Sequence, residues 1–202
     1  PVALNRGCKL TGFFLGHDKE YVGIARFHQE IDKEELEKKI KENFIGKIKQ
    51  TPPLKSRVRR KEREREIHEF EILEINENKK DVLFRVACQG GTYVRKLITD
   101  LGDSLNIKAH MLELRRIRAG IFCENHEFHP SVKMYEFEKA VDAYNEGDGK
   151  LLRDLIIPGE IIREIYPVVS VKDSAVKKLL TGKRIFIKDV LEAPDLKTDE
   201  LI

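Results

Sequence analysis

The chain has 202 residues, 41% of them hydrophobic, and a formal net charge of only +3. A chain of this length fits one or two domains with a hydrophobic core, and no apolar run approaches the roughly 20 residues of a membrane span. Its three cysteines lie at wide, irregular spacing, which suits neither a disulfide framework nor a zinc site. We therefore expect a globular protein with reduced thiols, in a cytosolic or nuclear compartment.

The first half of the chain predicts a strand, a helix and a hairpin in that order. Residues 19–28 have the pattern of a strand. Asp32 begins a helix with a capping-box-like pattern, and Gly46 ends it. The hairpin covers about residues 67–88 and turns at residues 76–78.

A run of cations lies between this helix and the hairpin, directly after Pro52 and Pro53. Composition alone does not distinguish a solvated loop from a functional one. The two prolines favour function, because they stiffen the approach and hold the following cations at fixed positions. The residues that we expect to contact RNA are Lys55, Arg57, Arg59 and Arg60.

A glycine turn follows the hairpin and leads into an amphipathic helix. Gly90 and Gly91 allow backbone angles or close approaches that other residues do not, and Thr92 is the expected helix N-cap. Apolar residues at helical spacing predict a helix over about residues 92–105 with one buried face. Arg95 lies in its first turn, where the positive end of the helix dipole disfavours a cation. Either an anion pairs with Arg95, or its side chain is simply solvated.

The second half of the chain adds a basic strand and another helix. Residues 110–118 predict a strand that carries Arg115, Arg116 and Arg118, some of which share a face. Together with the run of cations after Pro53, this strand gives two basic strips on either side of the glycine turn, an arrangement that could hold RNA. Residues 134–144 predict an amphipathic helix. Strands and helices alternate without regular βαβ spacing, which predicts an α+β fold with a mixed, mostly antiparallel central sheet and flanking helices.

Two stretches resemble the core signature of the TruB and dyskerin class of pseudouridine synthases. They are residues 90–97, Gly-Gly-Thr-Tyr-Val-Arg-Lys-Leu, and residues 109–120, Ala-His-Met-Leu-Glu-Leu-Arg-Arg-Ile-Arg-Ala-Gly. Three further segments resemble the family in the same order: the end of the segment after its catalytic loop, its tyrosine-bearing strand and its proline-rich RNA-facing loop, at residues 1–4, 19–22 and 51–56.

This resemblance implies a cofactor-free conversion of uridine to pseudouridine in RNA. It implies that Arg95 forms a forked ion pair with the nucleophilic aspartate, which lysine could not form bidentately. Tyr21 would stack on the flipped uracil and serve in proton transfer, and Leu114 would form an apolar wall of the pocket. Arg115 and Arg116, with the basic loop, would contact RNA. The alternative for Tyr21 is a purely structural position on a half-buried strand, and the alternative for Leu114 is a position in the core.

The family's glycine-threonine-leucine-aspartate-proline loop does not occur in these 202 residues. We therefore expect an N-terminally incomplete synthase, inactive by itself. We also expect a catalytic-domain portion at residues 1–165 and the incomplete start of a PUA-like RNA-binding domain at residues 166–202. Asn5 to Cys8 depart from the family pattern, as do Arg57 and Arg59, so local geometry and RNA contacts can differ there.

Residues 156–158 and 171–176 resemble the archaeal and eukaryotic dyskerin branch more than bacterial TruB. That branch implies a box H/ACA ribonucleoprotein with a guide RNA and small protein subunits, cytoplasmic in the archaeal type and nucleolar in the eukaryotic one. It implies no membrane partner. The rival interpretation is a non-catalytic RNA-binding or scaffold module of the same fold. The target, ribosomal or transfer RNA, and the use of a guide RNA stay open.

Overall fold

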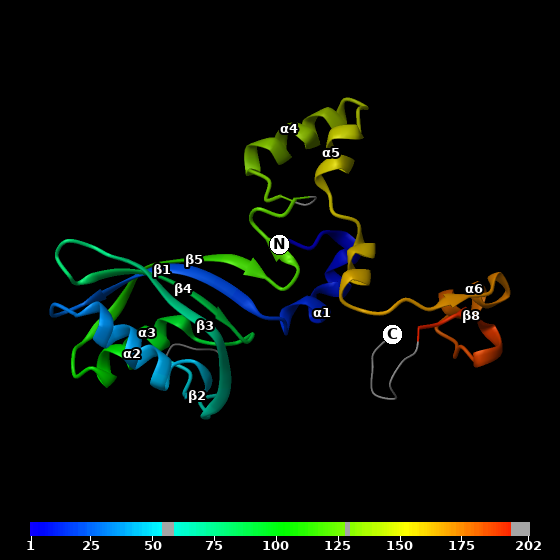
Figure 1. Cartoon of the computed structure of the whole chain (residues 1–202). Coiled ribbons are helices and arrows are strands. Elements are labelled where there is room, and N and C mark those ends of the chain that lie inside the picture. The colour runs from blue at the N-terminus through cyan, green and yellow to red at the C-terminus, as the bar shows by residue number, and fades with distance from the viewer. Residues whose placement is uncertain (54–58, 128–129, 195–202) are drawn as a thin grey trace. The chain divides into compact units, whose positions relative to one another are not determined.

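A computed structural model describes residues 1–53, 59–127 and 130–194 of the chain. The chain divides into two compact units, Pro1–Ser131 and Val132–Ile202 (Figure 1). Within the described ranges, no helix is long and apolar enough to cross a membrane. The domain boundary expected after residue 165 stays a prediction.

The first unit is built on a six-stranded sheet with the strand order β2-β3-β4-β1-β5-β6. Every pairing within it is antiparallel. The strands are β1 (Lys19–Phe27), β2 (Gly46–Gln50), β3 (Arg63–Ile75), β4 (Asp81–Cys88), β5 (Ala109–Ala119) and β6 (Phe122–Cys123). The predicted α+β class and mostly antiparallel sheet are confirmed, as are the strand at residues 19–28 and the hairpin.

Two helices, α2 (Lys33–Asn43) and α3 (Val94–Ser104), cover one face of this sheet (Figure 1). In α3 the buried side chains follow helical spacing, and they pack onto alternate residues of the strands. Burial of each large apolar side chain stabilises the fold by about 1.5–3 kcal/mol. The apolar side chains between the two helices and the sheet therefore form the stabilising core of the unit. The core residues of α3 are Val94, Leu97, Ile98 and Leu101, and those of β4 are Val82, Phe84, Val86 and Cys88.

The helix starts differ in how they are capped. Asp32 is the N-cap of α2, as predicted, and its Oδ1 accepts hydrogen bonds from the backbone N–H groups of Glu34 and Glu35, each at 3.0 Å. The prediction for α3 is wrong by one residue, because its N-cap is Tyr93. The hydroxyl of Thr92 instead donates to the carbonyl of Gln89 at 2.7 Å, which closes the glycine turn before the helix begins.

Two short helical segments precede β1: the 3-10 helix η1 (Asn5–Leu10) and α1 (Thr11–Leu15). The sequence patterns predicted neither of them. The ring of Phe14 packs edge-on against that of Phe122 with centroids 5.1 Å apart, so this segment is attached to the β6 end of the sheet.

The second unit contains α4 (Met134–Asn145), α5 (Lys150–Leu155), η2 (Gly159–Glu164) and α6 (Asp173–Leu180), with η3 (Ile187–Asp189) and the two-stranded sheet of β7 (Ser170–Val171) and β8 (Val190–Glu192). Helix α4 confirms the helix predicted at residues 134–144. Asp189 is buried, and its Oδ1 lies 2.7 Å from Nζ of Lys178, which supplies the paired charge that such burial requires.

Candidate functional site

Three residues predicted for the site lie on one face of neighbouring strands. Tyr21 of β1 is directly opposite Arg116 of β5, and Gly23, two residues along, is opposite Leu114. Directly paired residues of antiparallel strands share a face, so the side chains of Tyr21, Leu114 and Arg116 all emerge on the side covered by α2 and α3. Tyr21 and Leu114 are partly buried against the core. The structure therefore brings together an aromatic ring, an apolar side chain and a cation.

The glycine turn brings the start of α3 to the same end of the sheet. A Cβ at Gly90 would lie only 2.6 Å from the carbonyl oxygen of Gly16 and 2.9 Å from that of His17. No side chain fits there, so the turn packs directly against the backbone that leads into β1. Gly91 has φ +85°, a left-handed conformation that favours glycine.

Arg95 is exposed in the first turn of α3, which contains no acidic residue. Among the described residues, its guanidinium has no hydrogen-bond or ion-pair partner. A cation at this end of a helix is disfavoured by about 0.3–1 kcal/mol unless an anion is present. The chain itself supplies no such anion in the described ranges, so the position is suited to one brought by another segment or by a ligand.

Lys19 and Arg65 belong to this region, although sequence reasoning gave them no role. The side chain of Lys19 is buried, and its Nζ donates to the carbonyls of Leu15, at 2.6 Å, and His17. Burial and, secondarily, nearby Arg116 lower the pKa of Lys19. Lys19 thus holds the segment on which Gly90 packs, while Arg65 lies over the turn, with Nη2 3.2 Å from where a Cβ of Gly91 would be.

Tyr21 and Cys88 keep their protons at neutral pH. Burial raises the pKa of Tyr21, with a contribution from Cys88, although Arg116 opposes the shift through its charge and a side-chain hydrogen bond. Burial also raises the pKa of Cys88 to about 11. The site face therefore offers a neutral phenol beside a guanidinium, and a thiol that does not act as a nucleophile near pH 7.

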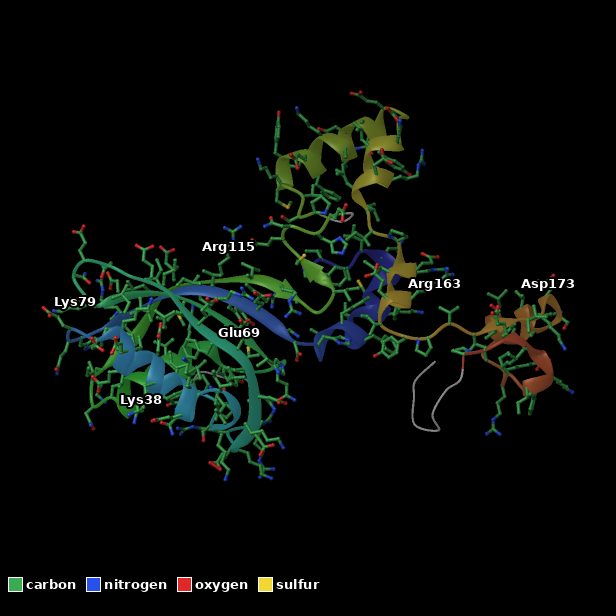
Figure 2. The ribbon with its side chains drawn as sticks, in the orientation of Figure 1. Lys38, Glu69, Lys79, Arg115, Arg163 and Asp173 are labelled. Carbon is green, nitrogen blue, oxygen red and sulfur yellow. The ribbon has the colours of Figure 1, made fainter. Side chains whose placement is uncertain are left out.

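Arg115 and Arg118 project from the opposite face of the sheet. Nη2 of Arg115 lies 2.8 Å from Oε2 of Glu124, and Nε of Arg118 lies 3.0 Å from Oε2 of Glu20. Figure 2 shows Arg115 on the side of β5 away from α2 and α3. The basic cluster on β5 is thus divided: Arg116 faces Tyr21, and Arg115 is engaged elsewhere.

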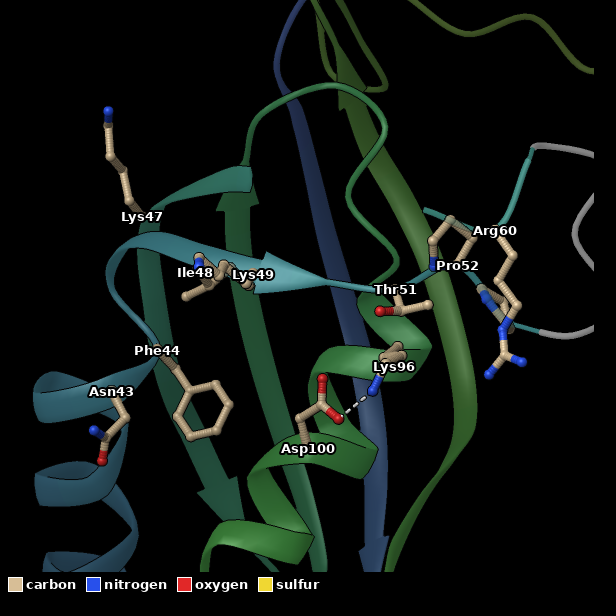
Figure 3. Close-up of a pocket in the computed structure, with 11 residues that line it drawn as sticks. Asn43, Phe44, Lys47, Ile48, Lys49, Thr51, Pro52, Arg60, Lys96 and Asp100 are labelled. Atoms are coloured by element: carbon tan, nitrogen blue, oxygen red, sulfur yellow. Dashed lines mark hydrogen bonds and ion pairs between the residues drawn. The ribbon is translucent and has the colours of Figure 1, made fainter. Parts of the chain in front are cut away.

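The basic loop is described only in part. Lys55 and Arg57 lie outside the described residues, whereas Arg59 and Arg60 are exposed. Arg60, Pro52 and Lys96 line a pocket of about 810 Å³ between β2, α2 and α3, in which Lys96 pairs with Asp100 (Figure 3). None of Tyr21, Arg95 and Leu114 lines this pocket, so it is separate from the candidate site.

Comparisons with known proteins point to one family. Residues 1–94 match the TruB family pseudouridylate synthase N-terminal domain, and residues 95–162 match the tRNA pseudouridylate synthase B C-terminal domain. A probable tRNA pseudouridine synthase B of Archaeoglobus fulgidus is 40% identical over 194 residues, covering 94% of this chain and 57% of that protein. Its counterpart in Saccharolobus solfataricus is 38% identical, covering 100% of this chain and 78% of that protein.

Solved structures agree with these relatives. The chain superimposes on a protein in a Cbf5-Nop10-Gar1 complex with a TM-score of 0.82 and 35% identity, covering 94% of this chain and 56% of that one. It also matches a chain of an H/ACA RNP bound to a substrate RNA containing 2'-deoxyuridine, with a TM-score of 0.77 and 32% identity, covering 93% of this chain and 54% of that one. This chain therefore spans about half the length of several of the proteins that it matches.

Proposed function

Because the chain belongs to the TruB family of pseudouridylate synthases, we propose that its protein converts uridine in RNA to pseudouridine. The reaction breaks the N-glycosidic bond, rotates the uracil and forms a carbon–carbon bond to the same ribose, and needs no cofactor. The observation that carries this proposal is the exposed Arg95 at the start of α3, whose guanidinium has no partner among the described residues and which lies beside the glycine turn that packs against the approach to β1.

Each residue of the site has a proposed part in this reaction. The guanidinium of Arg95 holds and orients a nucleophilic aspartate from a loop outside these 202 residues, since its planar fork matches a carboxylate bidentately. Tyr21 stacks on the flipped uracil and, because its pKa is raised, stays able to donate its proton. Leu114 forms an apolar wall on the same face. Arg116, opposite Tyr21, stabilises the bound RNA through its charge.

The outer cations extend the RNA-binding surface. Lys55, Arg57, Arg59 and Arg60 in the basic loop are proposed to bind phosphates of the substrate. Arg115 is proposed to bind RNA on the other face, where it would have to leave or share Glu124. Phosphate contacts of this kind position the RNA without reading its sequence.

The relatives and structures suggest two kinds of substrate selection. The named relatives are tRNA pseudouridine synthases, and the matched structures are Cbf5 with Nop10 and Gar1 and an H/ACA RNP with substrate RNA. We propose that the protein works in such a ribonucleoprotein, where a guide RNA selects uridines in ribosomal or transfer RNA. An archaeal-type protein would then act in the cytoplasm and a eukaryotic one in the nucleolus.

The test is pseudouridine formation by the full-length protein. Uridine-labelled transfer RNA is incubated with the protein alone, and guided substrate RNA with the protein assembled with guide RNA and partner subunits. Pseudouridine in either reaction supports the proposal, and the reaction in which it forms identifies the mode of selection. RNA binding without pseudouridine in both reactions would instead favour a non-catalytic scaffold.

A further inference from the structure

Gln50, the last residue of β2, makes an unusual contact with the start of α3. Its side chain is almost fully buried, at 2% exposure. The backbone N–H of Tyr93 donates to its Oε1 at 3.0 Å, and its Nε2 donates to the carbonyl of Tyr93 at 3.3 Å. One buried amide therefore forms hydrogen bonds with both backbone polar groups of a residue 43 positions away.

This contact replaces a missing helix cap. The first backbone N–H groups of a helix have no partner within it, and a cap side chain usually satisfies one of them. Tyr93, the N-cap of α3, makes no such side-chain hydrogen bond to the helix, and the first turn has no acidic residue. Gln50, at the end of β2, instead forms hydrogen bonds with the backbone of the N-cap residue, and so fixes where the helix begins.

Arg95 is two residues beyond this fixed peptide. The carbonyl of Tyr93 also accepts a hydrogen bond from the backbone N–H of Leu97 at 3.0 Å. Tyr93 is therefore held by Gln50 and by the helix itself. The backbone beyond Gln50 continues through Thr51 to Pro52, whose ring is fully buried. The same segment thus anchors the base of the basic loop and the helix that carries Arg95.

We propose that Gln50 is a positioning residue for Arg95, acting through the backbone of Tyr93. This inference rests on the proposed function, because it gives Gln50 an effect on the chemical step. Loss of the contact would let the first turn of α3 shift, and a displacement of about 1 Å at a reacting group can lower a rate by about 10²-fold.

The experiment uses Gln50→Ala and Gln50→Glu in the full-length protein. Single-turnover rates are measured at saturating enzyme, with RNA affinity and melting temperature. We expect Gln50→Ala to lower the rate at least tenfold while the Kd for RNA stays within twofold. A glutamate at this site keeps the acceptor for Tyr93 but donates only when protonated, so its rate relative to the wild-type protein should rise as pH falls.

Asn76→Ala is the matched control. Its side-chain oxygen accepts the backbone N–H of Asp81 at 3.1 Å, in the hairpin at the other end of β4 from the site. This variant should lose stability but keep a normal chemical rate below its melting temperature. Normal rates in both Gln50 variants would reduce Gln50 to a structural role. Absence of turnover in the wild-type protein would refute the proposed function itself and the role of Gln50 with it.

Discussion

Tyr21 and Arg116 lie directly opposite each other on β1 and β5, whereas Arg115 faces the other side of the sheet and pairs with Glu124. Two consecutive arginines of the same chemistry therefore have different surroundings. This difference allows one to serve as the control for the other.

Arg116→Gln should weaken RNA binding and also lower the single-turnover rate of bound RNA at least tenfold, because the charge beside Tyr21 is lost while a polar side chain is kept. Arg115→Gln should leave that rate within about twofold and affect only RNA affinity. Rapid-quench measurement of pseudouridine at saturating enzyme gives both rates. Equal rate losses would show that the face of β5 does not matter.

Arg95→Lys should preserve folding and most RNA affinity but lower the chemical rate by about 10²-fold. Lysine keeps the charge but loses the planar fork that orients a carboxylate. If Arg95 is instead a phosphate contact, the same change should mainly weaken binding. Single-turnover kinetics together with a binding isotherm separate the two roles, and a normal rate in the variant would remove Arg95 from the catalytic residues.

Tyr21→Phe should bind RNA nearly as well as the wild-type protein, because the aromatic ring is kept. Its turnover should be about 10²-fold slower if the hydroxyl transfers a proton. Burial raises the pKa of Tyr21 above its usual value of 10, so its phenol stays protonated through neutral and moderately alkaline pH. Between pH 7 and 9 the wild-type rate should therefore show no fall due to Tyr21, a shape checked by a pH–rate profile against the variant.

Replacement of Arg57, Arg59 and Arg60 with alanine should weaken RNA binding and make it less dependent on salt. Each lost phosphate contact lowers the slope of log K against log salt by slightly less than about one unit for duplexes, and by less for single strands. Titrations at several salt concentrations measure the slope. A variant with the wild-type slope would assign these three cations to solvated surface.

Much of the first unit could be predicted from local pattern. Strand β1, the β3–β4 hairpin and the buried face of α3 follow from periodicity, because each buries a regular set of side chains. The position of Arg95 in a first turn also follows from the glycine pair before it. The misplaced N-cap at Thr92 shows the limit of such reasoning: a threonine hydroxyl has several local acceptors, and here the carbonyl of Gln89 takes it.

What could not be predicted depends on contacts between distant segments. The pairing of Gln50 with Tyr93 and the burial of Lys19 leave no local pattern in the sequence. The placement of the β5 arginines on opposite faces of the sheet also has a cause that the sequence does not show. A register shift between Glu20 and Tyr21 leaves Ile117 unpaired, so Arg116 and Arg118, two residues apart, face opposite sides where simple alternation would put them on one.

Arg95, which has no partner among the residues that the structure describes, is expected to lower stability while it supports activity. An acidic residue is favoured at a helix N-terminus, so Arg95→Glu should raise the melting temperature even as it removes the proposed partner of the nucleophile. A library of variants selected only for heat resistance would therefore discard this arginine early. If selection for growth keeps Arg95 while selection for heat resistance loses it, the residue is required for function, and this can be concluded without an assay of the reaction.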